Sequence, residues 1–230
     1  MSLEQSIKNL KDQIDLSVPV ITIQNGLGAG DIALKHMSKN TIILGVAEGF
    51  GASLIAPGHV THTANKKIRL GSISQKQKVR KLENIVSAWR SGGFKTEIYE
   101  NIEQLIWEKL LCNVTLSGPC SIFGCNVKEL LNDEEHWAFA LNCMQEAYSV
   151  GLAEGIPFSF EDPIDYVTDF AKRVGSAKPS MLQDFETKKK TEIDFINGAI
   201  PPLAAKSKIP TPFNDHVCKI IHDAEKRIKP

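Results

Sequence analysis

Hydrophobic residues change their spacing near residue 100 of this chain. Before that point they form short β-branched runs bounded by Gly, Pro and Asn. These runs predict strands at 18–23, 41–47, 59–63, 68–71 and 96–99. One helical run lies among them, with Val79, Leu82, Val86 and Trp89 at helical spacing and a Gly-Gly stop at 92–93. We therefore expect an α/β region over residues 1–100.

After residue 100 the strand pattern stops, and helical patterns continue almost to the end of the chain. They cover 102–118, 136–155, 162–174, 180–196 and 212–228. The predicted fold class is therefore α/β followed by all-α, with a second, helical domain over residues 101–230. A complete doubly wound nucleotide-binding domain occupies on the order of 100–150 residues. Because this chain opens on a polar helical stretch at 3–10, we expect it to begin partway through a larger fold.

Composition excludes several classes of protein. The 230 residues carry 27 Lys and Arg against 27 Asp and Glu, which argues against a basic nucleic-acid tract or an acidic tail. No apolar stretch reaches the roughly eighteen residues of a membrane span, and the N-terminus has no signal-peptide pattern, so we expect a cytoplasmic protein. The five cysteines form no C-x-x-C motif and are predicted to be buried thiols. The six histidines likewise form no metal-binding pattern, and a metal site is unsupported.

A glycine-rich segment follows the first predicted strand. Gly28, Gly30 and Ala33 satisfy the spacing of a dinucleotide fingerprint, and Glu48 lies at a suitable distance to hold a ribose. Asp31, however, would lie beside the pyrophosphate, where a carboxylate repels the anion. Asp31 is better interpreted as a helix cap, and the glycines as a turn that lets the backbone pass close to another segment.

A narrow polar stripe crosses the apolar helix predicted at 102–118. Lys109, Asn113 and Ser117 are spaced i, i+4, i+8, so their side chains share one face. A lysine among apolar neighbours has a lowered pKa and can donate a proton near neutral pH. The alternative is a structural lysine whose stem is buried and whose amine reaches solvent. Spacing alone favours neither reading.

A second polar cluster lies between residues 178 and 198. Ser180 and Gln183 have the spacing of a capping box. Glu192 could be a solvated helix acid, and the run of three lysines at 188–190 is most simply a solvated face.

Three ordered motifs carry a resemblance to a known family. They are IQNGLG at 23–28, W-x-K-L-x-x-N at 107–113, and SMLQD at 180–184 followed by TEIDFING at 191–198. Together they resemble the ketopantoate reductase (2-dehydropantoate 2-reductase) family, from about residue 19 to about residue 222. This family reduces ketopantoate to pantoate with NADPH in pantothenate and coenzyme A synthesis. The resemblance implies a Rossmann domain followed by a helical domain like that of 6-phosphogluconate dehydrogenase.

The resemblance also implies roles for individual residues. Lys109 is expected to be the general acid, and Glu192 to contact the cofactor and support the site, which makes both catalytic. Lys109 would then lie near the Asn25 turn and near Glu192. The expected substrate ligands are Asn25, Asn113, Ser117 and Ser180. The expected cofactor ligands are Asn25, Glu192 and Ala52, the last through its backbone beside the nicotinamide carboxamide.

This chain departs from the family pattern in two respects. Ser117 stands where the family usually has a second asparagine, and Val127, next to Asn126, stands where it has another. Substrate choice could therefore differ, which leaves another branched 2-oxo acid as an alternative. The family's G-x-G-x-x-G turn also lies upstream of Met1, so we expect the chain to resemble only the later part of the Rossmann domain and to bind NADPH weakly or not at all.

The absence of that turn motivates a third hypothesis, in which the helical half is a non-catalytic dimerisation or binding scaffold. We also expect a homo-oligomer, because a partial sheet exposes an unpaired edge strand.

Overall fold

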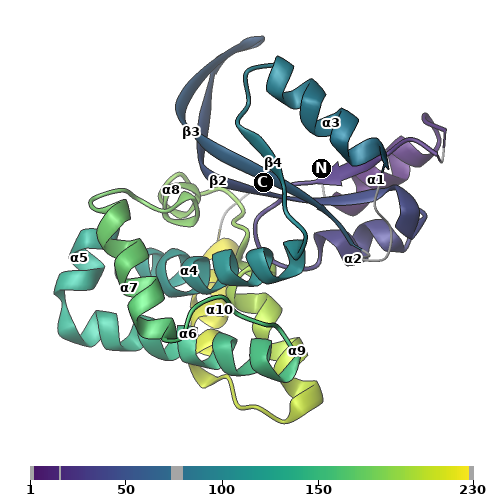
Figure 1. The fold of residues 1–230 in the computed structure, drawn as a ribbon. Coiled ribbons are helices and arrows are strands. Elements are labelled where there is room, and N and C mark those ends of the chain that lie inside the picture. Colours follow the sequence, from purple (N-terminus) through teal and green to yellow (C-terminus); the bar gives the residue numbers. More distant parts are fainter. Residues whose placement is uncertain (1–2, 16, 74–79, 228–230) are drawn as a thin grey trace. The chain divides into compact units, whose positions relative to one another are not determined.

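The computed structural model describes residues 3–15, 17–73 and 80–227, which form two compact units (Figure 1). The sheet unit comprises residues 1–24 and 28–105, and the helical unit comprises residues 25–27 and 106–230. The predicted fold class, α/β followed by all-α, is confirmed. A short segment, 25–27, belongs to the helical unit although the residues on both sides of it belong to the sheet unit.

A four-stranded mixed sheet forms the centre of the sheet unit, with strand order β1-β2-β3-β4. Its strands are β1 (Val20–Thr22), β2 (Ile42–Ala56), β3 (His59–Ser72) and β4 (Thr96–Ile98). β1 pairs parallel with β2, and β3 pairs parallel with β4, while β2 and β3 form a long antiparallel hairpin (Figure 1). Helices make the parallel crossovers, because parallel neighbours cannot be joined by a tight turn.

The predicted separate strands at 59–63 and 68–71 were wrong, because they form the single strand β3. The polar stretch between them pairs with the extension of β2 beyond Ala47. Glu48 lies directly opposite Lys67, and opposite charges across a strand pair favour pairing. Gly58, with a φ of 77°, lies in the turn between the two strands.

Three α-helices accompany the sheet among the described residues. They are α1 (Leu3–Lys11), α2 (Ala29–Leu34) and α3 (Arg80–Ser91). The core of the unit joins Ile43, Ile68 and Leu70 of the sheet to Leu82 and Val86 of α3. Burying each such side chain contributes about 1.5–3 kcal/mol. The prediction of this helix is confirmed from residue 80 onward, whereas its expected start at 75–79, with Val79, lies outside the described residues.

The interpretation of Asp31 as a helix cap was wrong. Gly28 occupies the cap position of α2 with a φ of 91°, and Asp31 lies inside the first turn. Only glycine adopts this left-handed conformation without a steric penalty, which explains why it takes the cap position here.

The helical unit is built around α4 (Ile102–Phe123), of which the residues from 106 onward belong to it. The other α-helices are α5 (Val127–Asn132), α6 (Glu134–Ala153), α7 (Pro163–Val174), α8 (Ser180–Glu186), α9 (Ile200–Ser207) and α10 (Pro212–Glu225). Two 3₁₀ turns, η2 (Ile193–Phe195) and η3 (Asn197–Ala199), connect α8 to α9. Side chains on several faces of α4 are buried, including Leu110, Leu111, Val114 and Cys120. A helix that is apolar on all sides is typical of a core position.

The helical pattern at 180–196 predicted a helix that is too long. α8 ends at Glu186, and Lys188 follows with a φ of 56°, a left-handed conformation that does not continue an α-helix. The predicted capping box is also wrong. Pro179 holds the cap position, Ser180 is already helical, and the Gln183 amide donates to the Lys178 carbonyl at 2.9 Å.

Cys112, Cys120, Cys143 and Cys218 are buried thiols, as predicted, whereas Cys125 is only partly buried. Burial raises the pKa of the Cys112 thiol to about 12, so this thiol is protonated near neutral pH.

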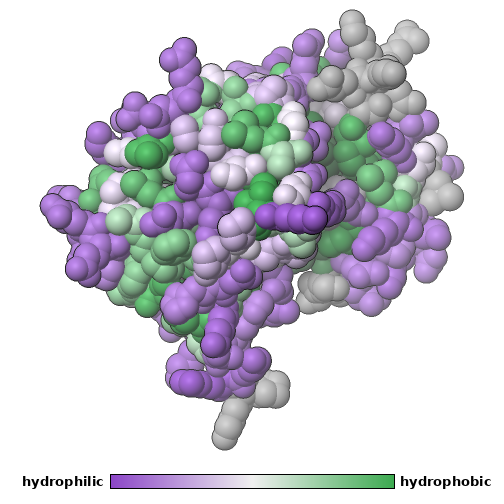
Figure 2. Space-filling model, turned by 90° about the horizontal axis from the view of Figure 1, so that it is seen from below, coloured by the Kyte–Doolittle hydropathy of each residue, from purple (hydrophilic) through white to green (hydrophobic). Residues whose placement is uncertain are grey.

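In the view of Figure 2, hydrophobic residues alternate with hydrophilic ones over the visible face. Within residues 3–15, 17–73 and 80–227, none of the helices combines the length and apolar character that a membrane span requires.

Candidate active site

Lys109 lies on α4, the most deeply buried helix of the helical unit. Its helical neighbours Trp107, Glu108 and Leu110 are buried, whereas Lys109 itself is half-buried. Glu108 accepts a hydrogen bond from the Ser159 backbone N–H at 2.8 Å and thereby ties the 158–159 loop to α4. The helix backbone that carries Lys109 is therefore held by packing and by polar contacts.

The Asn25 turn packs against η2 of the same unit. The Leu27 N–H donates to the Phe195 carbonyl at 2.8 Å. Gly26 has a φ of 80°, and a Cβ at this position would lie 1.9 Å from the Phe195 oxygen. A side chain cannot fit there, so the backbone of this glycine-rich segment passes close to another segment at Gly26. At Gly28 it does not, because an added Cβ would meet no atom within 4 Å.

Asn25 joins a cation to an anion. Lys109 Nζ donates to Asn25 Oδ1 at 2.8 Å, and Asn25 Nδ2 donates to Glu192 Oε2 at 3.0 Å. An ammonium can only donate and a carboxylate can only accept, so the two partners fix which end of the amide faces which. The expected proximity of Lys109, Asn25 and Glu192 is therefore observed, although Asn25 and Glu192 are 167 positions apart in the sequence.

The other predicted site residues occupy different environments. Asn113 and Ser117 follow Lys109 on α4 at one-turn intervals, Asn113 half-buried and Ser117 buried. Ser180 is exposed at the start of α8. Ala52 is exposed in β2 of the sheet unit, where the register with β3 shifts between Gly51 and Ala52. Asn126 caps α5, accepting from the Glu129 backbone N–H, and Val127 beside it is fully buried.

The sequence contains no local signal for the contact between the Asn25 turn and Phe195. The two segments are far apart in the chain, and the contact is made by backbone atoms, whose position no residue type reveals. Among the described residues, no group of three or more His, Cys, Asp or Glu side chains could hold a metal ion.

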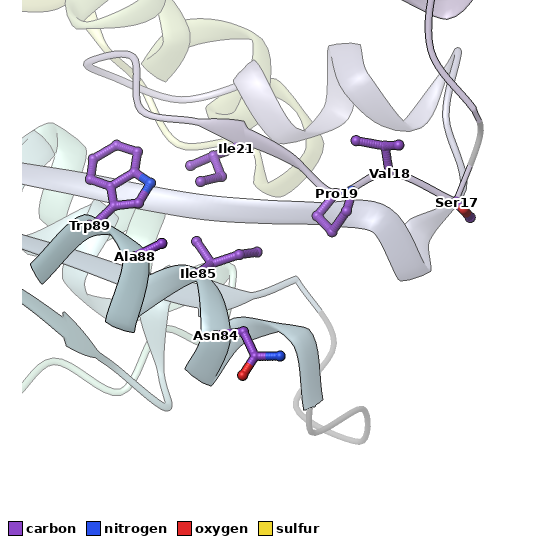
Figure 3. Close-up of a pocket in the computed structure, with 8 residues that line it drawn as sticks. All are labelled: Ser17, Val18, Pro19, Ile21, Asn84, Ile85, Ala88 and Trp89. Carbon is purple, nitrogen blue, oxygen red and sulfur yellow. The ribbon is translucent and has the colours of Figure 1, made fainter. Parts of the chain in front are cut away.

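The sheet unit has a groove of about 440 Å³ between β1 and α3 (Figure 3). Its lining is mostly apolar, with Val18, Ile21, Ile85 and Trp89 among the side chains drawn. None of the predicted site residues lines it.

The arrangement in the helical unit has a definite chemical capacity. A half-buried ammonium is oriented by a neutral amide, which is in turn oriented by a carboxylate. Such an ammonium can stabilise negative charge that develops on an oxygen atom and can then donate a proton to it.

Comparison with known proteins shows which family the chain belongs to. The family description "Ketopantoate reductase PanE/ApbA C terminal" matches residues 101–225, and "Ketopantoate reductase PanE/ApbA" matches residues 1–75. The chain belongs to the ketopantoate reductase family. The family resemblance found in the sequence is therefore confirmed.

Individual members of the family match the chain over almost its whole length. A 2-dehydropantoate 2-reductase of Streptococcus pyogenes serotype M6 is 28% identical over 226 residues, covering 98% of this chain and 73% of the relative. One of Lactococcus lactis subsp. lactis is 27% identical over 234 residues, covering 100% of this chain and 74% of the relative.

A solved structure of D-mandelate dehydrogenase with NADH and anilino(oxo)acetate has a similar fold. Its TM-score is 0.87 at 25% sequence identity, covering 98% of this chain and 74% of that chain. Both parts of the ketopantoate reductase fold present in this chain, the Rossmann-like part and the helical part, are thus found in solved relatives.

Proposed function

We propose that this protein reduces the 2-keto group of 2-dehydropantoate to pantoate with NADPH, as a step of pantothenate and coenzyme A synthesis. The observation that carries the proposal is the hydrogen-bonded series Lys109–Asn25–Glu192. Family membership supports it, as do relatives described as 2-dehydropantoate 2-reductases. In this proposal residues 1–100 are the later part of an NADP-binding Rossmann-like domain, and residues 101–230 form the substrate and dimerisation domain.

The side chains present suit the nicotinamide end of such a cofactor. The Glu192 carboxylate has about four lone-pair sites, of which Asn25 takes one, so it can also accept from a ribose hydroxyl or a carboxamide N–H. Ala52 would offer its backbone at the register shift of β2. A solved relative with NADH supports a nicotinamide cofactor, and the choice of NADPH follows the family resemblance.

When bound, the reduced nicotinamide supplies a hydride to the carbonyl carbon. The Lys109 ammonium stabilises the negative charge that develops on the carbonyl oxygen as the C=O double bond becomes single. Lys109 then donates a proton to this oxygen, which completes the alcohol and leaves a neutral amine that regains its proton from solvent. Asn25 holds Nζ in one direction, and Glu192 keeps the Asn25 amide from rotating.

Asn113, Ser117 and Ser180 are proposed as substrate ligands. Their amide and hydroxyl groups can bind the carboxylate and hydroxyl of a 2-oxo acid. Ser117 supplies one hydroxyl donor where an asparagine would supply two amide donors, which leaves another branched 2-oxo acid as the alternative substrate.

The experiment is a steady-state assay of the protein with NADPH or NADH as reductant. The substrates are ketopantoate and a smaller branched 2-oxo acid, 2-oxoisovalerate, and cofactor oxidation is followed by absorbance. The proposal expects the highest kcat/KM for ketopantoate with NADPH. A clear preference for 2-oxoisovalerate would move the function to another 2-oxo acid. A folded protein that binds NADPH, measured by a change in cofactor fluorescence, but reduces neither substrate would contradict the proposal and favour a non-catalytic scaffold.

Association into a homo-oligomer is part of the same proposal. β1 is an edge strand of the sheet, and an edge with unpaired backbone groups can pair with another chain. Light scattering that shows only a monomer at high protein concentration would contradict it.

A further inference from the structure

Glu225, the last residue of α10, accepts two hydrogen bonds from Thr191. Its Oε1 accepts from the Thr191 backbone N–H at 2.7 Å and from the Thr191 hydroxyl at 2.8 Å. Thr191 is buried, with 7% of its surface exposed. Because a carboxylate accepts hydrogen bonds more strongly than a neutral oxygen, this pair of contacts holds the Thr191 backbone firmly.

The Thr191 hydroxyl also contacts the backbone of Ile193, the residue that follows Glu192. Thr191 Oγ1 donates to Glu225 and accepts from the Ile193 N–H at 3.3 Å, so both its donor and its acceptor functions are used. The backbone N–H groups directly before and directly after Glu192 are thus both fixed. The Glu192 side chain, whose Oε2 accepts from Asn25 Nδ2 at 3.0 Å, therefore extends from a fixed stretch of backbone.

Two further contacts involve Asp194 and Phe195, which follow Thr191 in the same segment. His222 on α10 lies 2.7 Å from Asp194, measured between His222 Nε2 and Asp194 Oδ1. The Phe195 carbonyl accepts from the Leu27 N–H, two residues beyond Asn25. One short segment, 191–195, is therefore held by the last turn of α10 and in turn holds the Asn25 turn.

We propose that Thr191 and Glu225 are positioning residues that set the Glu192 carboxylate against Asn25 and thereby direct Lys109 Nζ. The kinetic part of this inference rests on the proposed reductase function. Thr191 and Glu225 are hydrogen-bonded to each other, and Thr191 also to the Ile193 N–H, so both act on Glu192 through the backbone of 191–193. A misplacement of about 1 Å at a catalytic group can cost on the order of 10²-fold in rate.

The chain contains a matched control for the Thr191–Glu225 hydrogen bond at the other end of α10. Thr211 is also buried, with 6% of its surface exposed, and its hydroxyl donates to Asp215 at 3.2 Å. Thr191→Val and Thr211→Val therefore each remove a buried threonine hydroxyl from a carboxylate, with the same change of side-chain shape. Only the first lies beside Glu192.

The first test is spectroscopic and independent of turnover. The side-chain amide signal of Asn25 is identified in a ¹H–¹⁵N spectrum by its loss in Asn25→Asp. We expect it to shift in Thr191→Val and in Glu225→Ala toward its position in Glu192→Ala, and to stay in place in Thr211→Val. An unchanged Asn25 signal in both Thr191→Val and Glu225→Ala would overturn the inference. If Thr191→Val fails to fold, Glu225→Ala provides the same test, because Glu225 lies at the end of α10.

The second test is kinetic. Thr191→Val is expected to lower kcat roughly ten- to a hundredfold with a smaller change in KM. Thr211→Val should keep the unmodified kcat at a similar melting temperature, and Thr191→Ser, which retains the hydroxyl, should recover most of the rate. Equal losses of kcat in Thr191→Val and Thr211→Val would mean a merely structural role and would overturn the inference.

The two readouts separate the failure of each proposal. If the unmodified protein reduces no 2-oxo acid but the Asn25 signal follows the expected pattern, the proposed function fails and the positioning stands. If turnover is present and the Asn25 signal does not shift in Thr191→Val or Glu225→Ala, the positioning inference fails and the proposed function stands.

Discussion

The two units differ in where they place their polar contacts. In the sheet unit, the ion pairs join partly exposed side chains along β2, β3 and β4, such as Lys67 with Glu97 at 2.9 Å and Arg69 with Glu48. The helical unit also has exposed ion pairs, such as Lys178 with Glu186 at 2.6 Å, but its Glu108, Glu146 and Glu225 carboxylates accept from backbone N–H groups of other segments. Exposed ion pairs exchange readily with water, whereas enclosed contacts with backbone groups fix geometry. Chemistry that needs side chains in set positions is therefore expected in the helical unit.

The largest effect on stability is expected at Glu146, which would sharpen this contrast. Its carboxylate on α6 accepts from the N–H groups of Phe213 and Asn214 and from the Asn214 amide, at 2.7–3.0 Å. Glu146→Ala leaves these donors without their partner and should lower the free energy of unfolding by about 3 kcal/mol. Urea denaturation measures the loss. Gln145→Ala, an exposed neighbour on α6, is the control, and an equal loss in both variants would show that enclosure adds nothing.

A smaller loss is expected from Gly26→Ala. The left-handed backbone costs an alanine about 1–2 kcal/mol, and the new Cβ must also displace the Phe195 carbonyl, so we expect about 2–3 kcal/mol in total. Gly28→Ala is the matched control in the sheet unit. It has a similar φ of 91° and no atom within 4 Å of the added Cβ, so only the backbone cost of about 1–2 kcal/mol applies. Equal losses at thermal denaturation would contradict the close approach of the Asn25 turn to η2.

Alkaline pH should weaken the helical unit through its thiols. Burial raises the pKa of Cys112 from an ordinary value of 9.0 to about 12, and that of Cys218 likewise to about 12. The folded state therefore favours the protonated thiol. This contribution is fully present below pH 9 and is lost as the pH rises from there toward the folded-state value.

The measurement is urea denaturation at several pH values between the ordinary thiol pKa of 9.0 and the folded-state pKa of about 12. Replacing Cys112 by Ala should make the decline with pH shallower by about 1 kcal/mol per pH unit. An identical decline in both proteins would show that the Cys112 thiol titrates normally in the fold.

The smallest effect is expected at the exposed ion pair of the sheet unit. Lys67→Met should leave stability at neutral pH almost unchanged, because surface pairs contribute little. The hydrogen bond from Lys67 lowers the pKa of Glu97 below its ordinary value of 4.5. The pair's contribution is therefore present above pH 4.5 and is lost as the pH falls through the folded-state value. A large loss in Lys67→Met at neutral pH would erase the contrast between the two units.

Local patterns in the sequence were sufficient for much of this architecture. The apolar run with one polar stripe predicted α4 and the shared face of Lys109, Asn113 and Ser117, because helical periodicity is a local property. The same reasoning overextended the helix after Ser180, since neither the left-handed Lys188 nor the 3₁₀ turns leave a hydrophobic signature. It also divided β3 in two, because the exposed arm of the hairpin is stabilised by pairing with β2 rather than by burial.

The site itself required more than local patterns. Spacing could not join Asn25 to Glu192, and their proximity was expected only from the family resemblance. Backbone hydrogen bonds group residues 25–27 with the helical unit and join Thr191 to Glu225. No residue type in the sequence indicates these bonds. These are consequences of tertiary packing, which a single sequence does not display.

The measurement that tests the reductase site most directly is the kcat for ketopantoate reduction in Lys109→Met. This change keeps the length and the apolar stem of the side chain and removes the ammonium. Lys172→Met, at an exposed lysine of α7, is its control. We expect kcat to fall about 10²–10⁴-fold in Lys109→Met while the melting temperature stays close to that of the control. A Lys109→Met protein that turns over as fast as Lys172→Met would contradict the assignment.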